Sequence, residues 1–447
     1  MSKIISIIII VLCAFVVFAQ KSRPVKKKTV PTTPAKNTPV VKSDAVITSV
    51  QAAVMADQII AEIGKLRGLK PLQPIKSGAK SRQQIEAMVI QNFNEEMTPE
   101  EFDADKKMLV AFGLVPKDFL YREFMVKLLT EQIAGFYDPK KKELNLADWN
   151  SMDLQKPIMA HELTHALQDQ YFDLRRFEKM PKGQGDYEMA IHALIEGDAT
   201  ALMLEYMLHP MGITLSKLPS EAVTKANEQM NSSGMEQLEK APKVIRESLL
   251  FPYGQGLNFA YELVKTRGWE GVSKAFKDLP QSTEQVLHFE KYEQREAPIK
   301  VQLADALPVL GAGWRRISLD VNGEYGYRVI LSEFLSRSES DQAAAGWGGD
   351  QYALYENNGA VVLAHLSVWD TAKDADEFFK SYAARTATRY KDAKEIKEEK
   401  ALRYTTPDGE TLIEKNEKTV LVIEGASAKN LRALATKLWT SKIGENK

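Results

Sequence analysis

The sequence has almost no cysteine: Cys13 is the only one in 447 residues. A single cysteine excludes an intramolecular disulfide and a cysteine-rich metal cluster. Histidine is also scarce, with six residues, so each one can be weighed as a functional group. Net charge is nearly absent, because 59 Lys and Arg face 60 Asp and Glu. This balance gives no indication of a nucleic-acid partner, and the 44% hydrophobic content is that of a globular protein.

The N-terminus carries a short apolar run. Lys3 precedes Ile4–Phe18, and small residues end the run at Ala19. The run is shorter than the roughly 20 apolar residues of a membrane span. We therefore expect residues 1–19 to be a secretory signal peptide, with an uncleaved anchor as the alternative. The protein would be secreted, periplasmic or in the cell envelope, and its mature chain would contain no cysteine.

Residues 20–45 are rich in lysine, proline and threonine. Such a segment buries little apolar surface and is typical of an extended linker. Its run Lys26-Lys27-Lys28 offers peripheral contact with anionic lipid or wall polymer of the envelope, although a solvated tether is the more ordinary interpretation.

Helical periodicity dominates from residue 46 to about 305. It predicts helices over 46–68, 82–94, 98–112, 117–133, 185–208, 218–248, 254–267 and 269–278, and a further one opened by Pro157. Thr98 and Glu101 form a capping box around Pro99. Between these helices, 133–137 and 143–146 flank a turn and predict a β-hairpin.

From about residue 310 the pattern becomes mixed. Helices are expected over 325–344, 371–389 and 427–441, and strands at 352–355, 361–368, 402–405, 411–414 and 419–424. Asn358-Gly359 is a strong hairpin turn. Trp347-Gly348-Gly349-Asp350 suggests a tight turn anchored by a buried tryptophan. The chain is thus predicted to be α+β, with a separate C-terminal α+β domain (310–447) built on a small antiparallel sheet.

The strongest motif is His161-Glu162-Leu163-Thr164-His165, an HExxH sequence on a predicted helix. Residues four apart share a helical face, so both imidazoles can bind one metal ion. Glu162 lies beside them and can take a proton from a water that attacks a carbonyl. HExxH therefore predicts a Zn²⁺ site with Glu162 as the general base.

A catalytic zinc needs a third protein ligand. The metzincin pattern HExxHxxGxxH is excluded, because Gln168 and Tyr171 replace its glycine and histidine. Glu196 is the favoured ligand, since it stands in an otherwise apolar helix where a carboxylate needs a partner. A buried Glu196–arginine pair is the alternative, and His192, one turn earlier, is the rival ligand.

Small residues and acids surround this candidate ligand. Gly197 and Ala199 leave room for a second helix to approach. Asp198 or Asp169 could orient a ligating imidazole. His209 and His365 are expected to be structural.

HELTHALQDQ followed by ALIEGDA resembles the gluzincin-type zincin metallopeptidases, in which two HExxH histidines and a downstream glutamate bind zinc. More closely, most of the mature chain is similar to a family of uncharacterised exported bacterial proteins, through TEQIAGFYDP (130–139), PYGQGLNFAYEL (252–263), STEQVLHFEKY (282–292) and AAAGWGGDQYALY (343–355). The resemblance implies a zincin-like metallopeptidase domain over 46–305.

The resemblance also implies two further roles. In zincins a strand before the HExxH helix pairs with extended substrate, which Ile133–Tyr137 or Glu143–Leu146 would do here. Zincins also place a His or Tyr at the developing oxyanion. His288 is the first candidate, and Tyr253, Tyr137 and Tyr292 are weaker ones.

The leading hypothesis is a secreted zinc metallopeptidase that acts on a peptide or protein substrate. One alternative is a zinc-binding envelope scaffold with an inactive peptidase fold. Another is a metal-dependent hydrolase of a non-peptide amide bond. An intact HExxH argues against the scaffold, because a structural zinc site needs no general base.

Overall fold

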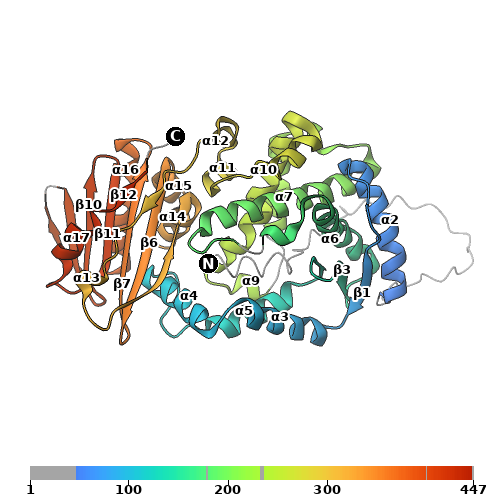
Figure 1. Cartoon of the computed structure of the whole chain (residues 1–447). Coiled ribbons are helices and arrows are strands. Elements are labelled where there is room, and N and C mark those ends of the chain that lie inside the picture. Colours follow the sequence, from blue (N-terminus) through green and yellow to red (C-terminus); the bar gives the residue numbers. More distant parts are fainter. Residues whose placement is uncertain (1–46, 178–179, 232–235, 399, 445–447) are drawn as a thin grey trace, which may run out of the picture.

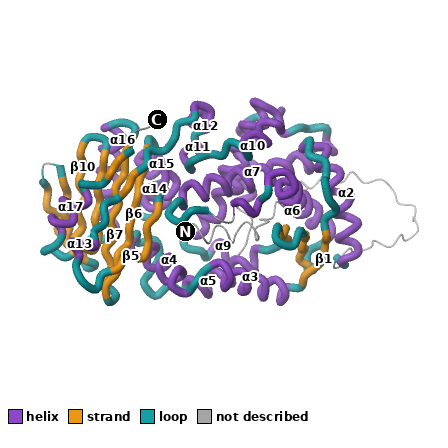
Figure 2. Tube along the Cα trace, in the orientation of Figure 1, coloured by secondary structure: helices purple, strands orange, loops and turns teal. Residues whose placement is uncertain are grey.

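The computed structural model describes residues 47–177, 180–231, 236–398 and 400–444 (Figure 1). The predicted signal peptide (1–19) and linker (20–45) lie outside the described residues. The fold is α+β: helices form most of the molecule, and a large antiparallel sheet forms one end. A small sheet beside α2 (Ser49–Arg67) lies at the other end (Figure 2). Within the described ranges, none of the helices combines the length and apolarity needed to cross a bilayer.

The first helices begin where local capping predicts. Helices α2, α3 (Arg82–Glu96) and α4 (Pro99–Ala111) each start with a complete capping box, and the predicted Thr98–Glu101 pair is confirmed. Such a box satisfies backbone N–H groups that a helix start leaves unpaired. Helix α5 (Tyr121–Gln132) follows and begins four residues later than predicted.

The small sheet has three strands in the order β1-β3-β2. The predicted hairpin is confirmed as β2 (Gly135–Asp138) and β3 (Glu143–Ala147). Strand β1 (Lys76–Lys80) pairs in parallel with β3 and was missed, because KSGAK has neither β-branched residues nor apolar alternation. Strand β3 is therefore central, and β2 keeps one free edge.

Three long helices form the centre of the molecule: α6 (Met152–Phe172), α7 (Gly185–Leu208) and α10 (Lys243–Ala275). The bounds of α7 match the prediction. Pro157 lies inside α6 instead of opening it, at the loss of one backbone hydrogen bond near the helix start. The helix predicted over 218–248 is divided among α8 (Ser220–Asn231), α9 (Glu236–Glu239) and the start of α10. Helix α10 then continues through Pro252, where a gap was predicted, and the second predicted break falls at Gly268 (φ 64°).

Shorter elements connect these helices and lead to the large sheet. They are η1 (Leu174–Phe177), η2 (His209–Met211), η3 (Leu215–Lys217), α8 (Ser220–Asn231), α9 (Glu236–Glu239), α11 (Thr283–Leu287), α12 (Phe289–Gln294) and the two-stranded ribbon of β4 (Val301–Gln302) and β12 (Lys442–Ile443).

The large sheet is antiparallel throughout, in the order β5-β6-β7-β11-β10-β9-β8. Its strands are β5 (Arg315–Asp320), β6 (Trp347–Asn357), β7 (Ala360–Trp369), β8 (Lys394–Lys397), β9 (Ala401–Thr406), β10 (Gly409–Asn416) and β11 (Thr419–Ala426). Helices α14 (Gly323–Ser332), α15 (Arg337–Ala344) and α16 (Ala372–Arg389) belong to the core on one face, and α13 (Leu307–Leu310) and α17 (Leu431–Leu438) to the core on the other.

The C-terminal predictions hold in outline and fail at several bounds. The Asn358-Gly359 hairpin is confirmed, with both residues at positive φ. The single helix expected over 325–344 is two helices. Ser427 Oγ accepts from the Asn430 N–H at 3.3 Å, but α17 itself begins only at Leu431, later than predicted. The residues 347–350 open strand β6 rather than forming a tight turn, although Trp347 is buried as expected.

The two parts of the chain share a core. The largest cluster of buried apolar side chains joins residues of α3 to α10 with Tyr327, Trp369 and Phe378 on the inner face of the large sheet. Arg389 of α16 donates to the backbone oxygens of Ala111 and Val110 at the end of α4, at 2.6 and 3.1 Å. The sheet region is therefore docked against the helices through both apolar packing and helix capping.

Candidate metal centre

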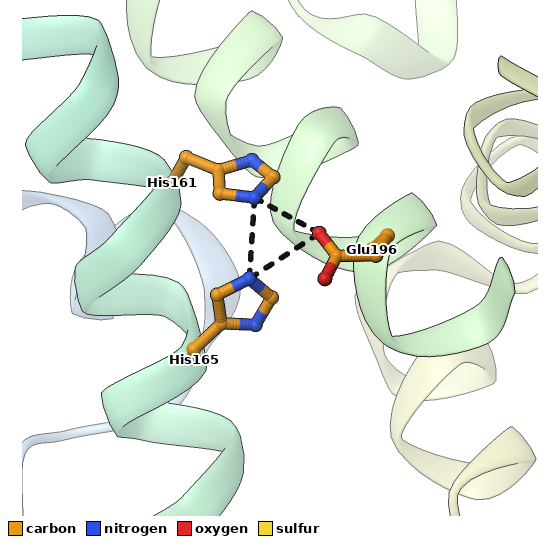
Figure 3. Close-up of side chains that lie close together, drawn as sticks. All are labelled: His161, His165 and Glu196. Carbon is orange, nitrogen blue, oxygen red and sulfur yellow. Dashed lines mark hydrogen bonds and ion pairs between the residues drawn. The ribbon is translucent and has the colours of Figure 1, made fainter. Parts of the chain in front are cut away.

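Helix α6 presents both motif histidines to α7. The Nε2 atoms of His161 and His165 lie 3.1 Å apart, and Glu196 Oε2 lies 3.1 Å from the first and 3.4 Å from the second (Figure 3). The three side chains are each about 2% exposed. The structure thus brings together the three residues that the sequence proposed as metal ligands. We call His161, His165 and Glu196 the metal group.

Close approach of α7 and α10 fixes this side of the site. A Cβ on Gly197 would lie 2.1 Å from the backbone oxygen of Gly256, and one on Gly256 would lie 2.2 Å from that of Ala193. Only glycine fits at such a crossing. The expectation that Gly197 admits a second helix is confirmed, and that helix is α10.

The donor set fits a tetrahedral zinc ion. Zinc bonds of about 2.0–2.1 Å place tetrahedral ligand atoms about 3.3–3.4 Å apart, close to the 3.1, 3.1 and 3.4 Å sides of this triangle. Two imidazoles and one carboxylate from facing helices are also the ligand types that zinc accepts. His161, His165 and Glu196 are therefore suited to hold such an ion, and a tetrahedral ion would have one further coordination position.

The electrostatics of the group favour positive charge at its centre. Burial opposes a charged imidazole at His165, but the Glu196 carboxylate outweighs it and raises the pKa of His165 to about 9. Burial alone would raise the pKa of Glu196, yet the two imidazoles lower it to about 2. The alternative of a Glu196–arginine pair is not what the structure has.

The general-base candidate is aimed by strand β2. Glu162 is buried, and its Oε2 accepts a hydrogen bond of 2.8 Å from the backbone N–H of Tyr137. That N–H bonds to α6 and not to β3, so the edge of β2 that β3 leaves unpaired faces the helix that carries the motif. Of the two strands expected to bind extended substrate, β2 has this free edge, whereas β3 is paired on both sides.

A polar chain that was not predicted continues from His165. Its Nδ1 lies 2.9 Å from Gln168 Oε1, and Gln168 Nε2 donates to Asp198 Oδ2 at 3.0 Å. Asp198 forms a buried ion pair with Arg67 of α2 at 2.8 Å. Asp198 thus reaches the imidazole only through Gln168. The sequence signal for Gln168 was its spacing of three residues after His165, on the same helical face.

Asp169 has a different task from the one expected. Its Oδ2 accepts from the Tyr137 hydroxyl at 2.8 Å and pairs with Lys142, and its Oδ1 accepts from the Leu174 N–H at 3.2 Å. These contacts tie the β2–β3 hairpin to the end of α6. Asp169 therefore orients the hairpin and not a ligating histidine. Burial, together with Asp169, raises the pKa of Tyr137 far above its usual value.

The oxyanion candidates are separated in space. Tyr253 of α10 lies beside the metal group, with its ring stacked on His161 at 5.9 Å between centroids. Tyr292 donates to the Asp278 backbone oxygen at 2.8 Å. His288 does not join the metal group: its Nε2 lies 2.9 Å from Glu324 on α14, and Glu324 raises its pKa. Helix α11 is tied to the first turn of α7 by the Thr283 N–H, which donates to Asp186 at 3.2 Å, and α14 is tied to α11 by the Tyr325 N–H, which donates to Thr283 at 3.2 Å.

The remaining histidines are not part of the group formed by His161, His165 and Glu196. His192 is buried on α7 and, in the described part of the chain, neither ring nitrogen has a hydrogen-bond partner. Burial lowers the pKa of His192 to about 4, so its ring is neutral. His209 is exposed, and His365 packs in the sheet region with Nδ1 3.0 Å from the Tyr327 hydroxyl. The structure does not bring the rival ligand His192 into the group.

Comparison with known proteins addresses the sheet region alone. Residues 313–435 match a family described as "Domain of unknown function (DUF8575)". No curated protein and no solved structure matches the chain. The matched segment runs from just before β5 into α17, so it excludes α6 and α7 and every residue of the metal group.

Proposed function

We propose that this protein is an exported zinc metallopeptidase of the zincin type. The observation that carries the proposal is the triangle of His161 Nε2, His165 Nε2 and Glu196 Oε2, with sides of 3.1 to 3.4 Å. The HExxH helix supplies Glu162 beside this triangle, and a sheet edge faces the same helix. A purely structural zinc site would not need that carboxylate.

The chain's own groups divide the work of hydrolysis. His161, His165 and Glu196 would hold the ion, which when bound supplies a Lewis acid for the scissile carbonyl and for water. Glu162 accepts the proton of the attacking water and passes it to the leaving nitrogen. The Tyr137 N–H fixes the direction in which the Glu162 carboxylate faces. The other backbone groups at the free edge of β2 would align an extended substrate by backbone pairing.

Tyr253 is the best placed of the four predicted oxyanion candidates, because its ring contacts a ligand histidine. We expect Tyr253→Phe to slow hydrolysis about 10²-fold or more, the usual cost of removing an oxyanion donor. Tyr292→Phe is the matched control, since that hydroxyl is bonded to Asp278. Equal rates in the two variants would remove Tyr253 from the mechanism.

The decisive test of the function compares Glu162→Gln with the wild type. We expect the variant to keep one zinc per chain and to lose about 10²–10⁴-fold in the hydrolysis of a mixed peptide library. Glu86→Gln on the exposed face of α3 is the control. Chelator should abolish wild-type hydrolysis. Undiminished hydrolysis by Glu162→Gln would reject the mechanism, and a library left intact by wild-type, zinc-loaded protein would favour a non-peptide amide or an inactive scaffold.

Ligand substitution tests the metal centre separately. His165→Ala should lose zinc, measured by metal analysis of the purified protein, because the site then keeps only two ligands. His209→Ala changes an exposed histidine and should leave the zinc content unchanged. Full zinc occupancy in His165→Ala would refute the ligand assignment.

Export is the remaining part of the proposal and depends on the sequence of residues 1–19. Expression in a bacterial host followed by mass measurement of the exported protein should give a chain that begins after Ala19. A protein that keeps residues 1–19 and stays with the membrane would indicate an anchor instead.

A further inference from the structure

Gln168 occupies an unusual position between the metal group and a remote ion pair. Its amide oxygen lies 2.9 Å from His165 Nδ1. Its amide nitrogen donates to the Ile195 backbone oxygen at 2.9 Å and to Asp198 Oδ2 at 3.0 Å. The side chain is completely buried. Every polar atom of this amide therefore has a protein partner.

These partners fix the orientation of the amide. A backbone oxygen has no proton to donate, and both oxygens of the Asp198 carboxylate accept hydrogen bonds from Arg67, at 2.8 and 3.3 Å. Both groups require the NH₂ end of Gln168, because the oxygen end would place acceptors against acceptors. The amide oxygen is thus forced toward His165.

The orientation of the amide in turn decides which ring nitrogen carries the hydrogen when His165 is neutral. Gln168 Oε1 is an acceptor, so His165 Nδ1 must carry the hydrogen. A neutral imidazole with hydrogen on Nδ1 has its lone pair on Nε2. Nε2 is the atom that faces His161 and Glu196.

We propose that Gln168 is a positioning residue that sets the tautomer and ring orientation of His165 for metal binding, and that the Arg67–Asp198 pair holds Gln168 in place. This role rests on the proposed metal centre. It also links α2 and α10 to the metal centre. Arg67 is the last residue of α2, and it donates further to the Trp269 backbone oxygen and to Ser273 Oγ of α10, both at 2.9 Å. Outer groups of this kind contribute about 10–100-fold to metal affinity.

The alternative is that Gln168 only satisfies buried polar groups. Gln155 provides the matched comparison, because it is also on α6, is completely buried, and donates to the Ala147 backbone oxygen at 2.7 Å. Loss of either amide should destabilise the metal-free protein to a similar extent. Only loss of Gln168 should change metal affinity.

The experiment measures the zinc dissociation constant of the full chain by chelator competition in the wild type, Gln168→Met and Gln155→Met. We expect Gln168→Met to weaken zinc binding about 10–100-fold and to alter the visible absorption of the Co²⁺-loaded protein. Gln155→Met should do neither. If the methionine variants fail to fold, Gln168→Asn and Gln155→Asn replace them, and the shortened amide should still weaken binding at position 168 alone.

The outcomes separate this role from the function on which it rests. Equal zinc affinities and Co²⁺ spectra in the position-168 and position-155 variants, with normal binding by the wild type, would overturn the role of Gln168 alone. A wild-type protein that binds no zinc would overturn the metal centre and this role together.

Discussion

The helical region and the sheet region both bury charged side chains, but they satisfy them differently. In the sheet region Arg385 pairs with Glu424 at 2.8 Å, and Tyr382 donates to the same carboxylate. In the helical region His161, His165 and Glu196 turn three acceptor-capable atoms toward one point. The first group pairs a cation with an anion inside the chain, whereas the second gathers three atoms that could hold a metal ion.

The buried polar groups of the two regions differ in a way that helps to recognise a binding site. Burial alone does not distinguish the two regions, since Arg385 and Glu196 are both almost fully inaccessible. The difference lies in the kinds of group that face one another. Arg385 faces a carboxylate, whereas two imidazoles and a carboxylate that converge on one point are also a set of metal-ligand types.

Breaking the Arg385–Glu424 pair should have the largest effect on stability. Arg385→Met leaves Glu424 in the core with Arg389 as its remaining ionic partner and removes a hydrogen bond to the Phe112 backbone oxygen. We expect a loss of about 3 kcal/mol in the free energy of unfolding, measured by urea denaturation. Zinc content should not change. Lys380→Met, on the exposed side of α16, is the control, and a loss of zinc in Arg385→Met would show that the regions are not independent.

A change at the crossing of α7 and α10 should lower both the stability of the protein and its affinity for zinc. In Gly197→Ala the added Cβ would meet the Gly256 backbone oxygen at 2.1 Å, so α7 must move away from α10. We expect a loss of about 1–3 kcal/mol together with weaker zinc binding, because Glu196 moves with α7. Gly326→Ala is the control, because Gly326 is also a helical glycine but its added Cβ would meet the Asn322 side chain at 3.3 Å rather than a backbone oxygen. A destabilised variant with normal zinc affinity would place the ligands on a more rigid unit than α7.

Much of this site could be predicted because its determinants are local. The spacing of His161 and His165 on one helix requires only helical geometry, and Glu196 was identified as an acid in an apolar helix. Asn358-Gly359 and the Thr98 capping box are likewise decided by a few neighbouring residues.

Features that depend on distant partners could not be predicted. Nothing near Gln168 in the sequence points to Arg67, which is separated from Asp198 by 131 residues. Strand β1 exists because β3 offers a pairing edge, and its own residues have weak β preference. His288 was chosen from a resemblance, and its contact with Glu324 depends on how α14 packs against α11.

The dependence of stability on pH can be tested at Asp186, where the two regions meet. Burial raises the pKa of Asp186 at the start of α7 to about 8, against hydrogen bonds from Thr283 and with help from nearby Asp350 and Glu324. The folded protein then holds a proton that the unfolded chain releases above pH 4, so stability falls as pH rises from about 4 to 8. Asp186→Asn removes this dependence of stability on pH.

We expect the melting temperature of Asp186→Asn to exceed that of the wild type by a few degrees at pH 8 to 9, with the difference shrinking toward pH 5. Asp57→Asn, on an exposed position of α2, is the control. A difference that is constant with pH would mean that Asp186 is ionised in the folded protein.

The smallest effect should come from α4, the helix that touches both regions. Its start is capped locally by Thr98, whose Oγ1 accepts from the Glu101 N–H at 3.2 Å, while its end is capped by Arg389 from the sheet region. Thr98→Ala should cost about 1 kcal/mol in urea denaturation, Thr98→Ser should restore most of it, and zinc binding should stay normal. An unchanged free energy of unfolding in Thr98→Ala would mean that docking by the sheet region alone orders α4. The helix would then be a tertiary element of the sheet region rather than an independent part of the helical one.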